Sequence, residues 1–172
     1  TKMKTRITAI LFALVLIQTS CNKIIDLYPE SNLNTGTFYS NFDEVRTALN
    51  GCYNGLQKTL TEEWTLTELR SDNSIMGTAG STSTVNRDLS DLDMFMPSTS
   101  HLGNYNYWSS VYYNIRNINL VLNALNVNYS ETNGTITYGT IAIPITDADR
   151  KILAAEATFL RAYHYFNLVR LY

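Results

Sequence analysis

Apolar residues recur at helical spacing in several stretches of the chain. In the first stretch they stand four, three and four residues apart and share one helix face: Val45, Leu49, Cys52 and Leu56. Ser40, followed three positions later by Asp43, has the form of a capping box. The pattern predicts a helix that begins at Ser40 and ends near residues 58–61.

Two further helices are predicted downstream. Residues 62–72 predict a short one, because acidic residues stand in its first turn, where the helix dipole favours negative charge. Residues 105–126 predict a long one, whose broad apolar stripe consists of Trp108, Val111, Tyr112, Ile115, Ile118, Leu122 and Leu125. Because Trp108 belongs to this stripe, we expect its side chain to pack between helices.

The sequence TDAD at residues 146–149 is a capping signal before the last helix. The apolar stripe predicted for that helix consists of Ile152, Ala155, Phe159, Ala162, Tyr163 and Phe166. The pattern runs to Tyr172 without a capping glycine or a proline. Because the sequence stops within the stripe, we expect the chain to be part of a longer protein.

Two segments between these helices lack helical spacing. Residues 73–104 are rich in Ser, Thr, Asn and Gly, and a loop of this length within a domain is often functional. Residues 127–145 contain the turn signal Asn133-Gly134 between Thr, Ile and Tyr residues. The sequence therefore predicts an all-α fold with long loops and a small β-hairpin within residues 127–145.

The N-terminal segment has the order of a secretory signal peptide. Lys2, Lys4 and Arg6 precede an apolar run at residues 7–17, which is shorter than the roughly 20 residues that a spanning helix needs. Small residues and Cys21 follow, so residues 1–20 resemble a bacterial lipoprotein signal with Cys21 as the acylated residue. Residues 21–37 would then form a lipidated tether. An ordinary cleaved signal followed by an unmodified cysteine is the alternative.

Composition narrows the classes of function. Without residues 1–20, the chain keeps ten of its 13 basic residues and all 15 acidic ones, a net charge of −5. Such a balance argues against a nucleic-acid partner. Cys52 falls on a helical stripe and is predicted to be a small buried hydrophobe. His101 and His164 have no partners at ligand spacing, so we expect neither a metal site nor a cofactor.

One short motif is typical of a helical repeat. Ala155, Phe159 and Ala162 have the A-x-x-x-F-x-x-A spacing of the second helix of a tetratricopeptide repeat, in which small residues let two helices approach closely. The long helix at residues 105–126 supplies large residues that match the first helix of such a repeat. Because one repeat cannot bury its own face, we expect further helices beyond Tyr172.

Taken together, these motifs resemble the N-terminal part of the SusD/RagB family of outer-membrane lipoproteins of Bacteroidetes. The matching residues are Cys21; Asp26-Leu27 and Pro29; Phe42 to Val45, Ala48, Leu49, Gly51, Tyr53 and Leu56; Glu68-Leu69 and Ser71-Asp72; Trp108, Tyr112, Ile115 and Asn119; and Ala155, Phe159 to Ala162, Tyr165-Phe166 and Leu168-Val169. The resemblance implies a tetratricopeptide-like, SusD-like domain, of which residues 38–172 are the N-terminal portion.

The resemblance also implies a function. Family members lie on the cell surface, anchored by lipid in the outer membrane, and cap a TonB-dependent transporter of the SusC type. They bind oligosaccharides or other nutrients and deliver them to the transporter, and they are not enzymes. Their helical repeats face the transporter, while loops outside the repeats hold the ligand.

A sugar-binding site needs exposed aromatic rings for the C–H faces of sugars, beside amides and carboxylates for the hydroxyl groups. Residues 73–107 supply this mixture, and we place the ligand-binding residues there: Asn73, Asn86, Arg87, Asp88, Phe95, Asn104, Tyr105 and Tyr107. Glu156 and Arg161 lie beside the last stripe, and we expect them to pair with each other in a structural role.

Two other functions remain as alternatives. A lipid-anchored helical-repeat adaptor that binds proteins would use the same anchor and helices. A surface glycosidase would need two carboxylates at a defined separation, and Glu62 with Glu63 or Asp91 with Asp93 are the candidate pairs.

Overall fold

The computed structural model of the chain describes residues 38–77 and 87–172. The predicted signal peptide at 1–20, the tether at 21–37 with Cys21, and the candidate ligand residue Asn86 lie outside these ranges. Residues from Tyr39 to Tyr172 belong to one compact unit.

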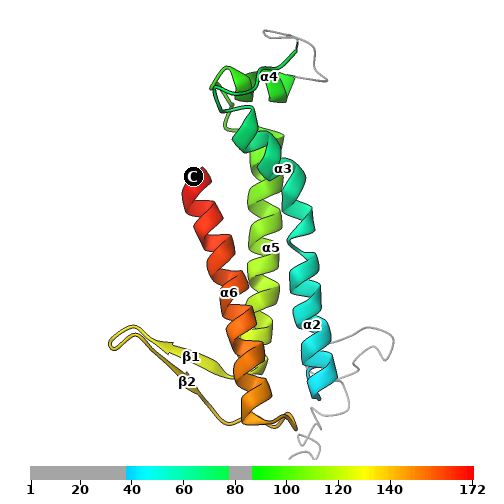
Figure 1. Cartoon of the computed structure of the whole chain (residues 1–172), viewed down its shortest axis with the longest axis vertical. Coiled ribbons are helices and arrows are strands. Elements are labelled where there is room, and N and C mark those ends of the chain that lie inside the picture. Colours follow the sequence, from blue (N-terminus) through cyan, green and yellow to red (C-terminus); the bar gives the residue numbers. More distant parts are fainter. Residues whose placement is uncertain (1–37, 78–86) are drawn as a thin grey trace, which may run out of the picture. The chain divides into compact units, whose positions relative to one another are not determined.

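This unit is built from helices and one hairpin, as Figure 1 shows. The helices are α2 (Phe42–Asn54), α3 (Gln57–Glu68), α4 (Arg87–Asp93), α5 (Leu102–Ala124) and α6 (Asp147–Leu171), and the strands are β1 (Val127–Ser130) and β2 (Thr135–Tyr138). The strands pair antiparallel around Gly134, whose φ of 65° suits the tight turn. The predicted all-α fold with a small hairpin in residues 127–145 is confirmed.

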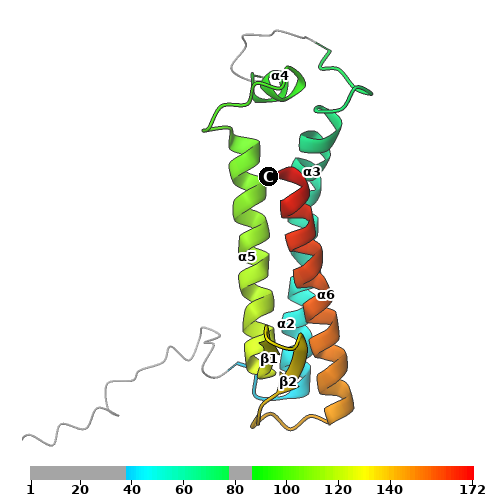
Figure 2. The same ribbon diagram turned by 90° about the vertical axis from the view of Figure 1, so that its left-hand side faces the viewer.

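Helix α5 lies beside α6 and beside the α2–α3 pair in both views (Figures 1 and 2). Buried apolar side chains fill two clusters along these helices. The cluster shared by α2, α5 and α6 comprises Val45, Leu49, Cys52, Ile118, Val121, Leu122, Leu125, Leu153, Ala154, Ala157 and Leu160. The other, nearer the start of α5, comprises Leu66, Leu92, Tyr107, Val111, Ile115 and Leu168. The core is thus formed where helices distant in sequence meet.

Several helix boundaries differ from the predictions. Asn41, not Ser40, caps α2, because its side chain accepts the Glu44 backbone N–H while the Glu44 carboxylate accepts from Ser40. Gly55 ends α2 earlier than predicted, and α3 begins at Gln57 rather than at residue 62. The predicted loop at residues 73–104 also contains a short helix, α4.

The apolar stripe predicted for α6 is exposed, and a different apolar face of the helix is buried. The buried face carries Leu153, Ala154, Ala157 and Leu160, whereas Phe159 is 65% exposed. The other large residues of the predicted stripe are exposed as well: Ile152, Tyr163 and Phe166. Small side chains at residues 154 and 157 allow α6 to approach its neighbours closely, and the face with the larger residues is therefore turned outward.

A buried polar contact joins the three long helical segments. The Asn114 side-chain amide donates to the carbonyl of Cys52 at 2.9 Å and lies 2.6 Å from Nε2 of His164. Gly55 is required beside it, since a Cβ there would collide with the Asn114 side chain. Burial raises the pKa of the Cys52 thiol to about 11, so this cysteine packs as a neutral group, as predicted.

Arg150 connects the start of α6 to the end of α5 and to the hairpin. Its guanidinium donates to the carbonyl of Leu125 at 2.9 and 2.6 Å and to that of Gly139 at 2.6 Å. The same group lies 5.1 Å from the ring centroid of Tyr138, within cation–π range. A cation is also favoured at the C-terminus of α5 by the helix dipole. This contact fixes both ends of the hairpin relative to α6.

Replacing Arg150 with alanine should therefore destabilise the fold. R150A leaves buried carbonyls without donors, and we expect a loss of about 2–4 kcal/mol in the free energy of unfolding. R150K keeps the charge but lacks the planar fork, so its loss should be smaller. Urea unfolding measures both, with K151A at the adjacent exposed position as the control, expected within about 0.5 kcal/mol of the original chain. Equal midpoints for R150A and K151A would contradict the assignment.

A second prediction concerns acid. Burial lowers the pKa of His164 below its ordinary value of about 6.5. The unfolded chain then binds this proton more readily, so the stability that neutral His164 contributes is complete above about pH 6.5 and declines below it. The variant H164Q still offers Asn114 an acceptor but does not titrate. Urea unfolding at pH 7.5 and pH 5.5 should show a larger acid loss for the original chain than for H164Q. Equal losses would refute this role.

Candidate ligand-binding site

The candidate site lies where α4 meets the first turn of α5. His101 holds these helices together, because its Nδ1 accepts the backbone N–H of Asn104 at 3.2 Å and its Nε2 lies 2.8 Å from the carbonyl of Asp88. Both contacts are satisfied when the neutral ring carries its proton on Nε2 and donates it to Asp88. The side chain is buried and caps α5.

Helix α4 is further fixed by its own residues. Leu92 is buried in the cluster near the start of α5, and the Asp93 carboxylate accepts the backbone N–H of Met76 at 3.2 Å. The helix closes at Phe95, whose φ of 56° is unusual for a residue with a bulky side chain. The backbone N–H of Met96 then bonds to the carbonyl of Asp91 at 2.8 Å. This closure leaves the Phe95 ring 62% exposed.

The structure gives the predicted ligand residues different surroundings. Asn73, Asp88, Phe95 and Tyr105 have exposed side chains. Arg87 lies 3.7 Å from Asp91 in a pair one helical turn apart and is largely exposed. These five residues remain candidates for contact with a ligand.

Helix α4 and the first turn of α5 lie at the same end of the unit (Figure 2). Tyr105 is 67% exposed in the first turn of α5, and Phe95 follows directly after α4. Asn104 has a structural contact there, because its carbonyl accepts the hydroxyl of Tyr172 at 2.9 Å. Both rings are exposed, and an exposed ring is the surface that the C–H face of a sugar requires.

The prediction of Tyr107 as an exposed ligand residue is wrong. Its side chain is 1% exposed in the core, and burial raises its pKa well above the usual tyrosine value. Trp108, which was predicted to pack between helices, is only partly buried: it packs against other rings but stays 44% exposed. Steps of three or four residues backward from Leu125 reach residue 107 as readily as 108, so the periodicity alone could not decide between them.

An aromatic cluster that the sequence did not predict forms around Trp108. Its ring centroid lies 4.6 Å from that of Tyr112 and 5.1 Å from that of Tyr172, the latter in an edge-on arrangement. The three rings join the outer side of α5 to the end of α6. Their partial exposure adds aromatic surface beside the candidate site.

The predicted pair of Glu156 and Arg161 does not form. The Glu156 carboxylate accepts from Arg46 at 2.9 and 3.0 Å and from the Tyr53 hydroxyl at 3.2 Å, which ties α6 to α2. Arg161 donates to the side-chain oxygen of Asn119 at 3.1 Å. Positions i and i+5 do not face each other on one helix, so these two residues do not pair. Each bonds to a different helix instead.

Of the two carboxylate pairs considered for a glycosidase, Asp91 and Asp93 have structural partners. Asp93 accepts a backbone N–H and Asp91 faces Arg87. Within residues 38–77 and 87–172, no three His, Cys, Asp or Glu side chains gather to hold a metal ion. None of the helices in those ranges has the length and apolar character to cross a membrane.

Comparison with known families gives one match. The family model SusD-like_3, described as "Starch-binding associating with outer membrane", matches residues 23–172. The chain belongs to the SusD-like family. No curated protein and no solved structure matches it. The match in this SusD-like chain covers every described helix and the hairpin, so the candidate site at α4 and α5 lies within the family region.

Proposed function

We propose that this SusD-like protein is a surface-exposed outer-membrane lipoprotein that binds an oligosaccharide, or another nutrient, and delivers it to a SusC-like TonB-dependent transporter. It acts by binding and not as an enzyme. The observation that carries the proposal is the family match over residues 23–172, whose description names starch binding and the outer membrane.

The end formed by α4 and α5 supports a binding role. Phe95 and Tyr105 expose their rings on elements that His101 and Asp93 hold in place. A ligand that meets fixed aromatic faces loses little affinity to the ordering of the protein. We therefore assign these two residues to ligand contact, with Asn73, Arg87 and Asp88 as polar neighbours.

The exposed face of α6 favours a second candidate function, that of an adaptor for proteins. Ile152, Phe159 and Phe166 are more than half exposed on this face. Apolar surface of this kind is buried by further helices in stacked repeats, or by a protein partner. An adaptor would bind a partner through it and ignore every glycan.

Alanine variants of the two exposed rings test the binding site. We expect F95A and Y105A each to lower the affinity of the full-length protein for its best polysaccharide about fivefold to tenfold, since each loses one stacking face. Isothermal titration against a panel of polysaccharides provides the ligand and the affinities. Y165A, which removes an exposed tyrosine from α6, is the matched control and should bind normally.

Two results of that titration would count against the proposal. Full affinity in the double variant F95A/Y105A would move the site away from α4 and α5. Failure of every polysaccharide to bind, together with specific capture of a protein partner through the α6 face, would favour the adaptor.

Cys21 supplies the test of anchoring. Expression of the full-length protein in its native host should give a mature N-terminus at Cys21 that carries fatty acid. The protein should then stay in the membrane fraction, because two or more acyl chains hold a protein stably on a membrane. C21S should leave the membrane fraction. Mass spectrometry of the N-terminal peptide decides, and a mature terminus without fatty acid would contradict the lipoprotein assignment.

A further inference from the structure

The hairpin presents one face toward α6. Tyr129 and Ile136 are direct cross-strand partners, so their side chains lie on the same face of the two-stranded sheet. Val127 stands two residues before Tyr129 and therefore shares that face. These three side chains form a largely apolar wall with one phenol hydroxyl.

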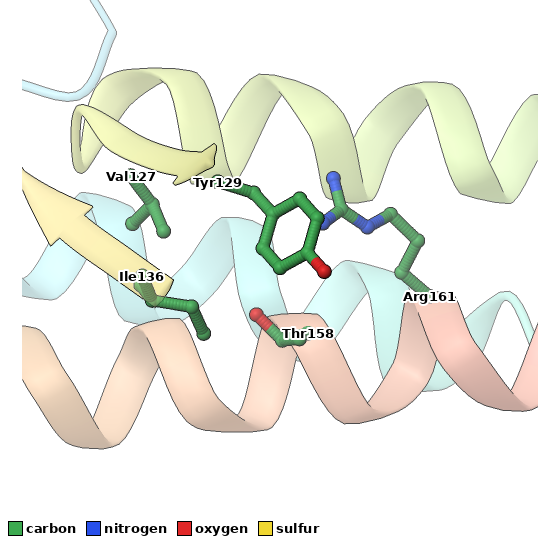
Figure 3. A pocket seen from close by; sticks show the side chains of 5 residues that line it. All are labelled: Val127, Tyr129, Ile136, Thr158 and Arg161. Atoms are coloured by element: carbon green, nitrogen blue, oxygen red, sulfur yellow. The ribbon is translucent and has the colours of Figure 1, made fainter. Parts of the chain in front are cut away.

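Helix α6 supplies the opposite wall. Thr158 and Arg161 are three residues apart and so lie on one side of the helix. Together with Val127, Tyr129 and Ile136, they line a cavity of about 320 Å³. Figure 3 shows the hairpin side chains and the two α6 side chains around this space. Small-molecule sites have volumes from about 300 Å³ upward, so the cavity suits a single small unit such as a sugar ring.

Arg161 is the charged group of this cavity. Its contact within the described residues is one hydrogen bond to the amide oxygen of Asn119, and no carboxylate of the described residues lies within ion-pair distance of it. A guanidinium has five N–H donors, so most of them remain available to a ligand. Its planar fork matches the two oxygens of a carboxylate.

We propose that this cavity binds a carboxylate-bearing sugar unit, such as a uronic acid within an oligosaccharide. Arg161 holds the carboxylate, Thr158 offers a hydroxyl to the ring substituents, and Tyr129 covers a C–H face of the ring. Tyr129 is 62% exposed and can receive such a face. The saccharide part of the ligand rests on the proposed function, whereas the carboxylate part rests on Arg161 alone.

The apolar wall is the reason to choose a sugar over a bare anion. An inorganic or small organic anion would use the guanidinium but leave Val127, Ile136 and the Tyr129 ring uncovered. A sugar acid meets both kinds of surface at once. The site therefore differs from the α4–α5 end, where the Arg87 guanidinium already faces the Asp91 carboxylate at 3.7 Å.

Isothermal titration of the full-length protein tests the proposal with three probes: a short uronic acid oligomer, its carboxyl-reduced neutral counterpart, and acetate. The acidic oligomer should bind at least tenfold more tightly than the reduced one, because a charge-assisted, bidentate contact is lost on reduction. Acetate should bind much more weakly than the oligomer. The preference for the acidic oligomer should also weaken as salt is raised.

Variants separate ligand contact from a structural role of Arg161. R161Q should abolish the preference for the acidic oligomer, and R161K should retain only part of it. N119A breaks the same interhelical hydrogen bond but keeps the guanidinium, so it should retain the preference. R116Q removes an exposed arginine elsewhere on α5 and is the matched control. Thermal unfolding of each variant shows that it is folded.

Equal affinity for the two oligomers, or an unchanged preference in R161Q, would overturn the proposal. Loss of the preference in N119A as well would assign Arg161 a structural role and would also overturn the proposal. Acetate that binds as tightly as the oligomer would show that the saccharide ring adds no affinity, and would overturn the saccharide part of the proposal. In each case a neutral polysaccharide that binds through Phe95 and Tyr105 would leave the proposed function intact. If no glycan of either kind bound, both proposals would fail.

Discussion

The arrangement of this unit depends on the hydrogen bonds that Arg150 donates to the end of α5 and to the base of the hairpin. One buried guanidinium bonds to the carbonyls of Leu125 and Gly139, which lie on either side of the hairpin in the sequence. The base of the hairpin closes further through Asn126, whose side chain donates to the carbonyl of Thr140 at 2.9 Å. Because Arg150 belongs to the first turn of α6, it holds the hairpin against that helix, where Tyr129 and Arg161 line the cavity.

The long helices are held together by both apolar and polar contacts. Small residues on the inner face of α6 allow close packing, and Asn114 joins α2, α5 and α6 through a buried polar contact. The larger apolar residues of α6 remain outside, where a repeat architecture buries them against further helices. At the α4 end of the unit, His101 has a role similar to that of Arg150. Each side chain bonds to a backbone carbonyl and so fixes a short element to a long helix. The elements that carry candidate ligand residues are thus positioned by single polar side chains on a rigid helical scaffold.

Much of the fold could be predicted from local patterns. The spacing of Val45, Leu49 and Cys52 gave the buried face of α2, and Asn133-Gly134 gave the hairpin. Periodicity failed where two registers fit equally well, as at Tyr107 and Trp108, and on α6, where both faces are apolar and the larger residues turned outward. Helix α4 has only seven residues and too few apolar positions to show a period.

The candidate sites show the same limit. Exposed Phe95 and Tyr105 were predicted from composition, because a polar segment with aromatic residues is recognisable without its structure. The cavity beside Arg161 could not be predicted, because it forms only where the folded hairpin meets Thr158 and Arg161 in the middle of α6. The sequence offers one weak signal for this cavity: Arg161 has no acidic residue three or four positions away. The partner expected for it, Glu156, stands five positions away and bonds to Arg46 instead.

The central claim is that this SusD-like chain carries saccharide-binding surface on the short elements held at the ends of its helices. Hydrogen–deuterium exchange of the full-length protein, measured with and without its best-binding glycan, tests this most directly. For a neutral glycan, the account predicts slower exchange in residues 87–107 and no change in α6. Slower exchange confined to α6, or no change anywhere in residues 87–107, would contradict it.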